Sequence, residues 1–226
     1  MNKSYDILIP AYNAAHTLPV LLKQLATLSP PARQIFVVND GSTDDTEQVL
    51  SKSSVHRITN ESNKGKGFAL RQGFQAFLTQ SDSEYLICMD ADLQHPAACI
   101  PDFLAQSQHD PAVVIGWRRR KPGKMPLPRI VSNSLTSFIL SQITGQKILD
   151  SQCGFRMIRR PVLQQLQLSE DGFQLETEFI LQAAARGFPI RFIPIPTIYN
   201  DHGSHINHLG DTLRFIKLVW NRITKK

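Results

Sequence analysis

The chain has 226 residues, of which 42% are hydrophobic and 19% charged, so it is long enough to bury one sizeable core and is not disordered. Its net charge of +6 includes basic clusters at 118–124 and 214–226, which indicate an anionic partner such as a phosphate, a phospholipid or a nucleic acid, unless they are only solvated surface. No apolar run approaches the roughly 20 residues that span a bilayer, and the N-terminus reaches an acid too early for a signal peptide, so we expect a cytoplasmic protein.

Strand-like and helix-like segments alternate through the first half of the chain. Five runs rich in β-branched or aromatic residues predict strands at 5–10, 34–39, 55–59, 84–90 and 112–117. Segments of helical period lie at 16–28, 42–50 and 65–78, the second with Ser42 and Asp45 as a capping pair. A further helix is expected at 130–143. Segment 172–179 is expected to enter another helix that runs to about residue 186, and 196–200 is strand-like. This alternation predicts an α/β fold with parallel strands joined by crossover helices.

Polar residues follow three of the predicted strands. They are Pro10–Asn13 after the first strand, Asn39–Thr46 after the second and Asp90–Gln94 after the fourth. Ligands of open parallel sheets bind beyond the carboxyl ends of the strands. We therefore expect these three segments to converge at one edge of the sheet.

The stretch CMDADLQHP, residues 88–96, places two aspartates one residue apart after a buried strand. If the segment stays extended, Asp90, Asp92 and Gln94 share one face. Hard oxygen ligands suit Mg²⁺ or Mn²⁺, which would offset the repulsion between the carboxylates and leave coordination positions for substrate phosphates. The alternative is that one aspartate caps a helix that begins near Pro96.

Five motifs in order, PAYN, VVNDGSTDDT, NKGKGFALRQG, MDADLQHP and DSQCGFRMIRR, resemble those of glycosyltransferase family 2, particularly its dolichol- and polyprenyl-phosphate sugar synthases. The resemblance covers nearly the whole chain. Ala14 departs from it, because the family usually has an acidic residue there, and Asn39 stands where the family often has Asp. The resemblance implies a Rossmann-like glycosyltransferase A fold, with a mainly parallel central sheet flanked by helices, in a catalytic domain at 1–208.

The resemblance also implies a function and a set of site residues. The expected reaction is a metal-dependent, inverting transfer of sugar from a nucleoside diphosphate to polyprenyl phosphate of the dolichyl or undecaprenyl type. The residues that bind the nucleotide would be Pro10, Tyr12, Asn13, Asp40, Lys66 and Asp90. The ligands of Mg²⁺ or Mn²⁺ would be Asp90, Asp92 and Gln94, and the catalytic residues would be Asp92, Glu176 and Arg118. The residues that bind the acceptor or a phosphate would be Arg118, Arg129, Ser204 and His205. Asp40 would accept hydrogen bonds from the base.

Two acceptors stay open. A phosphate monoester is ionised at neutral pH, because its second pKa is about 6, so it can attack directly and needs a cationic cradle such as Arg118 and Arg129. A hydroxyl of a saccharide or glycolipid needs a general base. Glu176 aligns with the base of family members that use sugar acceptors, whereas Glu178 would point away around the helix. Negative charge at a helix N-terminus is the plain alternative for Glu176.

The C-terminal segment 209–226 predicts a basic amphipathic helix. Its apolar stripe is Leu213, Ile216, Val219, Trp220 and Ile223, beside Arg214, Lys217, Arg222, Lys225 and Lys226. Such a helix, with a second apolar face at 130–143, fits peripheral association with the cytoplasmic face of a membrane, unless both helices pack on the domain. No nucleic-acid partner is expected. A nucleotidyltransferase and a non-catalytic binding module fit less well, because there is no glycine-rich loop near the N-terminus and a binding module has no evident need for a divalent cation.

Overall fold

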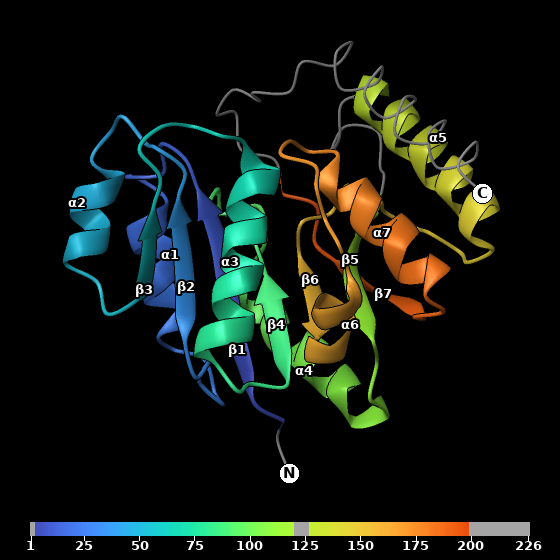
Figure 1. Ribbon diagram of the computed structural model, residues 1–226, viewed down its shortest axis with the longest axis horizontal. Coiled ribbons are helices and arrows are strands. Elements are labelled where there is room, and N and C mark those ends of the chain that lie inside the picture. The colour runs from blue at the N-terminus through green and yellow to red at the C-terminus, as the bar shows by residue number, and fades with distance from the viewer. Residues whose placement is uncertain (1–2, 120–126, 199–226) are drawn as a thin grey trace.

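A computed structural model of the protein describes residues 3–119 and 127–198 (Figure 1). Several predicted features lie outside these ranges, namely the C-terminal helix at 209–226, Ser204, His205 and most of the basic cluster at 118–124.

Within the described ranges, seven strands form one sheet, in the order β3-β2-β1-β4-β6-β5-β7. They are β1 (Tyr5–Ala11), β2 (Ile35–Asn39), β3 (His56–Thr59), β4 (Tyr85–Cys88), β5 (Val113–Arg118), β6 (Arg156–Arg159) and β7 (Ile190–Ile195). Strand β1 pairs in parallel with β2 and β4, β2 pairs in parallel with β3, and β5 pairs in parallel with β7. Strand β6, which the sequence did not predict, is antiparallel to β4 and β5. The predicted mainly parallel α/β sheet is therefore confirmed.

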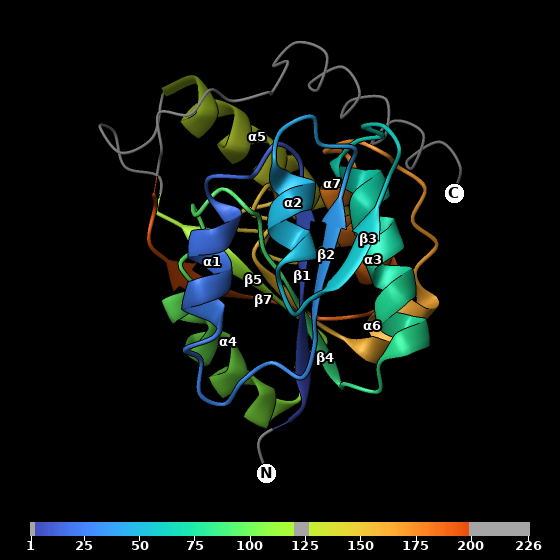
Figure 2. The same cartoon turned by 90° about the vertical axis from the view of Figure 1, so that its left-hand side faces the viewer.

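Helices cover both faces of this sheet. They are α1 (Leu18–Leu25), α2 (Thr46–Ser51), α3 (Lys66–Gln80), α4 (Ile100–Gln106), α5 (Leu127–Thr144), α6 (Arg160–Gln165) and α7 (Leu175–Ala185), with short 3₁₀ turns at Ala97–Cys99 and Ser107–His109. Figure 2 shows α1 and α4 on one face and α3 and α6 on the other. Strand β1 lies inside the sheet, and Ile7, Leu8 and Ile9 are fully buried, as in other strands covered on both faces.

The antiparallel direction of β6 decides which loops meet. Arg156, the first residue of β6, is the register partner of Cys88 at the end of β4 and of Ile115 in β5. The segment that precedes β6 therefore lies beside the segment that follows β4. Residues from the middle of the chain thus reach the edge of the sheet that the parallel strands also point to.

The predicted capping pair of Ser42 and Asp45 is wrong. Helix α2 begins at Thr46, and Asp45 makes no side-chain capping hydrogen bond. Asp44 Oδ1 instead accepts a hydrogen bond from the Thr46 amide, at 3.0 Å. Ser42 Oγ accepts one from the Asn13 amide, at 2.9 Å, so the Ser42 side chain joins two loops rather than capping a helix.

The last strand lies earlier than predicted. Residues 196–198 are not a strand, and β7 ends at Ile195. Strand β7 contains Pro194, which cannot donate a backbone hydrogen bond, but among the described strands β7 lies at the edge of the sheet and pairs with β5 alone. The edge position explains why a proline-containing segment still forms a strand.

Candidate active site

Three charged side chains from distant segments meet beyond the carboxyl end of β4. Lys66, the first residue of α3, places Nζ 2.7 Å from Asp90 Oδ1 and 2.9 Å from Glu176 Oε1 in the first turn of α7. Gly154 lies against this cluster, and a Cβ there would stand 2.9 Å from both Asp90 carboxylate oxygens. The close approach requires glycine, and the cluster has no room for a larger residue at this position.

The charges of this cluster stabilise one another. Burial raises the pKa of the Asp90 carboxyl, but the positive charge of Lys66, its hydrogen bond to Asp90 and the further charge of Arg118 together bring that pKa down to about 2. Burial alone would lower the pKa of Lys66, yet the charges of Asp90 and Glu176 raise it well above its ordinary value. Lys66 and Asp90 therefore stay charged at neutral pH.

The segment after β4 turns, so the expectation of an extended face with Asp90, Asp92 and Gln94 is wrong. Leu93 has a φ of +64°, and Asp92 Oδ1 accepts a hydrogen bond from the Gln94 amide at 3.0 Å, which closes the turn. The helix-capping alternative also fails, because the residue that caps the 3₁₀ turn is Pro96, without a side-chain hydrogen bond.

The acidic turn has the chemistry of a site for a divalent cation that the substrate completes. Burial and the negative charge of Asp90 raise the pKa of the Asp92 carboxyl, so the two carboxylates repel each other, and a cation would offset this repulsion. Across residues 3–119 and 127–198, no group of three or more His, Cys, Asp or Glu side chains could hold a metal ion. Asp90, Asp92 and Gln94 as ligands of Mg²⁺ or Mn²⁺ stay a prediction; a cation held by so few protein oxygens would have coordination positions left for substrate oxygens.

His95 supports Asp90 from behind, a role that sequence reasoning missed. Its Nδ1 accepts a hydrogen bond from the Asp90 amide at 3.1 Å, and its ring stacks on Phe155 with centroids 5.3 Å apart. Burial lowers the pKa of His95 to about 4, so the imidazole is neutral and Nδ1 remains an acceptor at neutral pH. The signal in the sequence was a histidine directly before Pro96 in the same motif.

Asp40 holds the turn that begins α3. Asp40 Oδ1 accepts hydrogen bonds from Asn60 Nδ2 at 2.8 Å and the Lys64 amide at 3.0 Å, and Oδ2 accepts one from the Gly65 amide at 2.8 Å. Gly65 has a φ of +102°, a left-handed conformation that favours glycine. Asp40 thus positions Lys66, and its contact with a nucleotide base stays a prediction.

The loops after β1 and β2 are joined at the other side of the edge. Asn13 Oδ1 accepts a hydrogen bond from the Thr43 amide at 2.8 Å, and Asn13 itself has a φ of +50°. Tyr12, next to it, is 40% exposed, and Pro10 is the last but one residue of β1. The convergence of these loops agrees with the expected position of a nucleotide pocket, and the roles of Pro10, Tyr12 and Asn13 stay predictions.

Arg118, the last residue of β5, pairs with a buried acid that sequence reasoning did not single out. Its Nε and Nη2 lie 2.8 and 3.0 Å from Asp150 Oδ2 and Oδ1. The positive charge of Arg118 contributes to the lowered pKa of Asp90, so Arg118 acts electrostatically on the same site. Arg129 lies in α5, and its side chain is outside the described part of the structure.

Glu176 faces the cluster and Glu178 does not, which agrees with the choice of Glu176 from the resemblance and with a helical spacing that lets only one of the two face the site. Glu178 accepts hydrogen bonds from the amides of Ser169 and Glu170 at 2.9 and 3.0 Å, so it fixes the loop before α7. That loop carries Asp171, whose carbonyl oxygen accepts a hydrogen bond from the Phe68 amide. Glu178 therefore supports the start of α3 from a distance.

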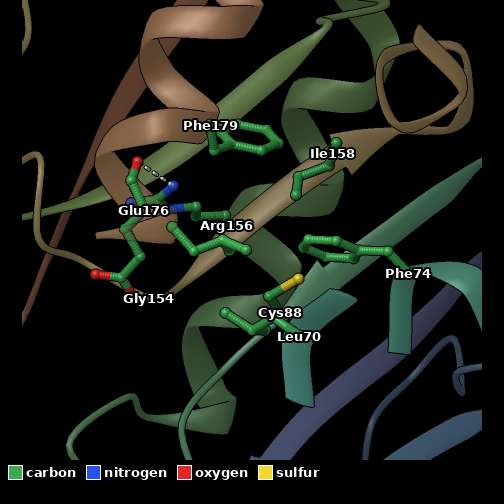
Figure 3. Close-up of a pocket in the computed structure, with 9 residues that line it drawn as sticks. Leu70, Phe74, Cys88, Gly154, Arg156, Ile158, Glu176 and Phe179 are labelled. Carbon is green, nitrogen blue, oxygen red and sulfur yellow. Dashed lines mark hydrogen bonds between the residues drawn. The ribbon is translucent and has the colours of Figure 1, made fainter. Parts of the chain in front are cut away.

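A small pocket lies behind Glu176, between α3 and α7 (Figure 3). The residues that line it are Leu70, Phe74, Cys88, Gly154, Arg156, Ile158, Leu175, Glu176 and Phe179. Arg156 donates hydrogen bonds to the carbonyl oxygens of Glu176, at 3.2 Å, and Cys153, at 2.8 Å. This arginine ties α7 to the segment before β6.

This sheet order, with an acidic turn and a lysine gathered beyond β4, defines an enzyme of the glycosyltransferase A fold. Crystal structures of glucosyl-3-phosphoglycerate synthase from Mycobacterium tuberculosis share that fold. The complex with phosphoglyceric acid superposes with a TM-score of 0.77 at 20% identity, over 97% of this chain and 80% of that one. The complex with Mn²⁺, UDP and phosphoglyceric acid superposes with a TM-score of 0.74 at 17% identity, over 99% and 78%.

The family model for glycosyl transferase family 2 matches residues 6–167, and the chain belongs to this family. An uncharacterized protein of Methanocaldococcus jannaschii is 32% identical over 86% of this chain and 88% of its own. Glycosyltransferase AglJ of Haloferax volcanii is 27% identical over 89% of this chain and 65% of its own length. Undecaprenyl-phosphate 4-deoxy-4-formamido-L-arabinose transferase of Salmonella paratyphi B is 27% identical over 98% of this chain and 67% of its own. The protein is therefore a glycosyltransferase, as the motifs imply.

Proposed function

We propose that the protein transfers a sugar from a nucleoside diphosphate to polyprenyl phosphate, with inversion and with a divalent cation, at a membrane surface. The observation that carries this proposal is the burial and ion pairing of Glu176, the expected general base for a hydroxyl acceptor. Its side chain is only 5% exposed, and its Oε1 lies 2.9 Å from Lys66 Nζ. A general base must reach the proton that it removes. A buried, ion-paired carboxylate is poorly placed for this task, whereas a phosphate acceptor needs no base.

The cationic groups of the site suit a reaction between two phosphates. Arg118 lies at the end of β5 with its guanidinium held in a fixed plane by Asp150, and such a fork binds a phosphate with two hydrogen bonds. Lys66 lies beside Asp90, where it would contact the donor nucleotide. Asp90, Asp92 and Gln94 would hold the cation, which when bound offsets the negative charge on the departing nucleoside diphosphate.

One relative supports the lipid phosphate acceptor, and another supports the nucleotide-sugar donor and the cation. The Salmonella relative is named for undecaprenyl phosphate. Structures of the mycobacterial synthase contain Mn²⁺ with UDP or UDP-glucose. A UDP-sugar, Mn²⁺ and a polyprenyl phosphate are therefore the first substrates to test.

The membrane part of the proposal rests on α5. Val131, Leu135 and Phe138 are 66%, 57% and 62% exposed, and their spacing places them on one helical face. Among the described helices, none is both long and apolar enough to cross a bilayer. Contact with a membrane through this exposed face would bring the active site to a lipid-linked acceptor.

The test compares two lipids of equal chain length. The purified protein is incubated with Mn²⁺ and a panel of nucleotide sugars, either with polyprenyl phosphate or with the matching polyprenol, and the lipid-linked sugar is measured by mass spectrometry. We expect product only from the phosphate. Product from polyprenol, or from a saccharide supplied instead, would favour the hydroxyl acceptor.

A further inference from the structure

We propose that Asp150 is a positioning residue for the transfer, which fixes the guanidinium of Arg118 in the orientation that binds the acceptor phosphate. This inference rests on the proposed function, in which Arg118 holds that phosphate. Asp150 Oδ2 accepts hydrogen bonds from Arg118 Nε at 2.8 Å and from the Arg118 backbone amide at 3.3 Å. Asp150 Oδ1 accepts one from Arg118 Nη2 at 3.0 Å. One carboxylate thus holds both the side chain and the main chain of the arginine.

Groups of the protein itself fill the hydrogen-bonding positions of the Asp150 carboxylate. Asp150 is fully buried, whereas the Arg118 side chain is 12% exposed. The Gln152 amide donates a further hydrogen bond to Asp150 Oδ1 at 3.3 Å, so each carboxylate oxygen accepts two hydrogen bonds. A buried carboxylate with both oxygens occupied has no remaining contact to offer a substrate. Asp150 therefore acts through Arg118 rather than on the reacting atoms.

The turn that carries Asp150 is anchored on three sides. The Ser151 amide donates a hydrogen bond to Ser137 Oγ in α5 at 3.2 Å, and Gln152 Nε2 donates one to Thr177 Oγ1 in α7 at 3.5 Å. Arg156 Nη2 in β6 donates one to the Ser151 carbonyl oxygen at 3.0 Å. These contacts hold the Asp150 carboxylate in place, so the orientation it imposes on Arg118 is a property of the fold.

A guanidinium group has two edges that form paired hydrogen bonds. Asp150 occupies the Nε edge of Arg118 and thereby fixes the direction in which the Nη1–Nη2 edge points. Without the carboxylate, Arg118 would gain rotamers that point this edge elsewhere, and each binding event would have to order the side chain again. Misplacement of a reacting group by about 1 Å costs up to about 10²-fold in rate.

The test is a double-mutant cycle with Arg118→Ala and Asp150→Asn, assayed with polyprenyl phosphate over a range of donor concentrations that reaches saturation. We expect Asp150→Asn to lower kcat by about 10-fold to 10²-fold and to leave the KM for the donor unchanged. In the Arg118→Ala background, Asp150→Asn should cause no further loss, because the group it positions is absent. Added guanidinium ion should partly restore Arg118→Ala, and should fail to restore the double variant.

The matched control is Asp82→Asn, which breaks the exposed pair of Asp82 with Arg33, and its kcat should equal that of the wild type. Equal losses from Asp150→Asn in both backgrounds, or wild-type turnover of Asp150→Asn, would overturn the positioning role. Full activity of Arg118→Ala with polyprenyl phosphate is a different result, because it overturns the proposed function as well. If Asp150→Asn does not fold, Arg118→Lys decides: a single ammonium lacks the fork, so unchanged kcat in that variant overturns the proposal.

Discussion

Gly154 lies so close to Asp90 that a Cβ at residue 154 would stand 2.9 Å from both oxygens of the carboxylate and 3.1 Å from Lys66 Nζ. Atoms at such distances overlap, so any side chain here must displace the acidic group or the lysine. The backbone before β6 therefore forms one wall of the charged cluster.

Gly154→Ala should lower kcat by about 10²-fold, because displacement of Asp90 by about 1 Å moves the groups that hold the donor. Gly145→Ala is the matched control. Gly145 has a φ of +66° and no atom within 4 Å of its built Cβ, so alanine there should cost about 1 kcal/mol of stability and leave kcat unchanged. Equal kcat in both variants would show that the close approach at Gly154 has no role in catalysis.

Asp92→Asn should abolish the response of the protein to metal without lowering the stability of the fold. Burial and the charge of Asp90 raise the pKa of Asp92, so its ionised form costs stability at neutral pH, and asparagine removes this cost. Without metal, the Tm of the variant should equal or exceed that of the wild type. Mn²⁺ at about 100 times its Kd should raise the wild-type Tm by about 5–10 °C and leave the variant unchanged, and kcat of the variant should fall by orders of magnitude. An equal response of both proteins to Mn²⁺ would place the cation elsewhere.

The chemical class of the acceptor should decide which of the two variants, Glu176→Gln or Arg118→Ala, has the lower kcat. With a phosphate acceptor, Glu176→Gln should cost less than about 10-fold in kcat, because no proton is removed, while Arg118→Ala should be severe. Loss of a true general base costs about 10² to 10⁴ in rate. Measurement of kcat for both variants with saturating donor decides the matter: collapse in Glu176→Gln beside near-normal Arg118→Ala would favour the hydroxyl acceptor.

Replacement of Val131, Leu135 and Phe138 by serine should weaken sedimentation of the protein with anionic vesicles by about 10-fold or more, because three exposed apolar side chains would no longer enter the membrane. Val20→Ser is the control, since Val20 is 45% exposed on α1. Vesicle binding that survives the triple replacement would assign membrane contact to another part of the chain.

Asn39→Asp should destabilise the protein in a pH-dependent way. Asn39 Nδ2 donates a hydrogen bond to Glu47 Oε2 at 2.8 Å, and this bond is the main cause of the lowered pKa of Glu47. In the wild type the resulting stability is present above the ordinary pKa of a glutamate and is lost as the pH falls through the lowered one. Aspartate would instead repel Glu47, at a cost of about 1 kcal/mol, because the Glu47 side chain is 44% exposed.

Thermal melts at several pH values check this prediction. The difference in Tm between the wild type and Asn39→Asp should be largest near pH 7 and should close on acidification, as the carboxylates are protonated. A difference that stays constant with pH would mean that packing, rather than charge, distinguishes the two residues. Asn39→Ala removes both side-chain hydrogen bonds of Asn39, to Glu47 and from the Ser42 amide, without adding charge, so its Tm difference from the wild type should not depend on charge repulsion.

The loops that follow parallel strands could be found from the sequence, because a strand pattern that ends in polar residues predicts where ligands bind. Asp90 and Asn13 were reached in this way. The helical spacing of Glu176 and Glu178 predicted only that one of the two faces inward, and the resemblance to the family favoured Glu176. Asp150 and Gly154 could not be found by this reasoning, because they precede a strand. Strand β6 has only four residues, one of them the buried Arg156, so it lacks a hydrophobic pattern that would reveal it.

Local backbone geometry was the second reason why part of the site could not be predicted from the sequence. The turn at Asp92 depends on a left-handed Leu93, a conformation that few residues other than glycine adopt, so the sequence favoured an extended segment. The role of Asp40 was likewise hidden, because two of its three partners are backbone amides 24 and 25 positions away, and the third is the Asn60 side chain. Every residue except proline has a backbone amide donor, so no sequence motif identifies such a partner.

The contact between Lys66 and Glu176 joins residues 110 positions apart in the chain. Contacts of such long range form late in folding, because the intervening loop must first be closed. Strands β1 to β4, with the donor-side loops, lie within the first 88 residues. We therefore expect the nascent chain to build that half of the sheet first, and to become an enzyme only when α7 docks and brings the last charge of the cluster.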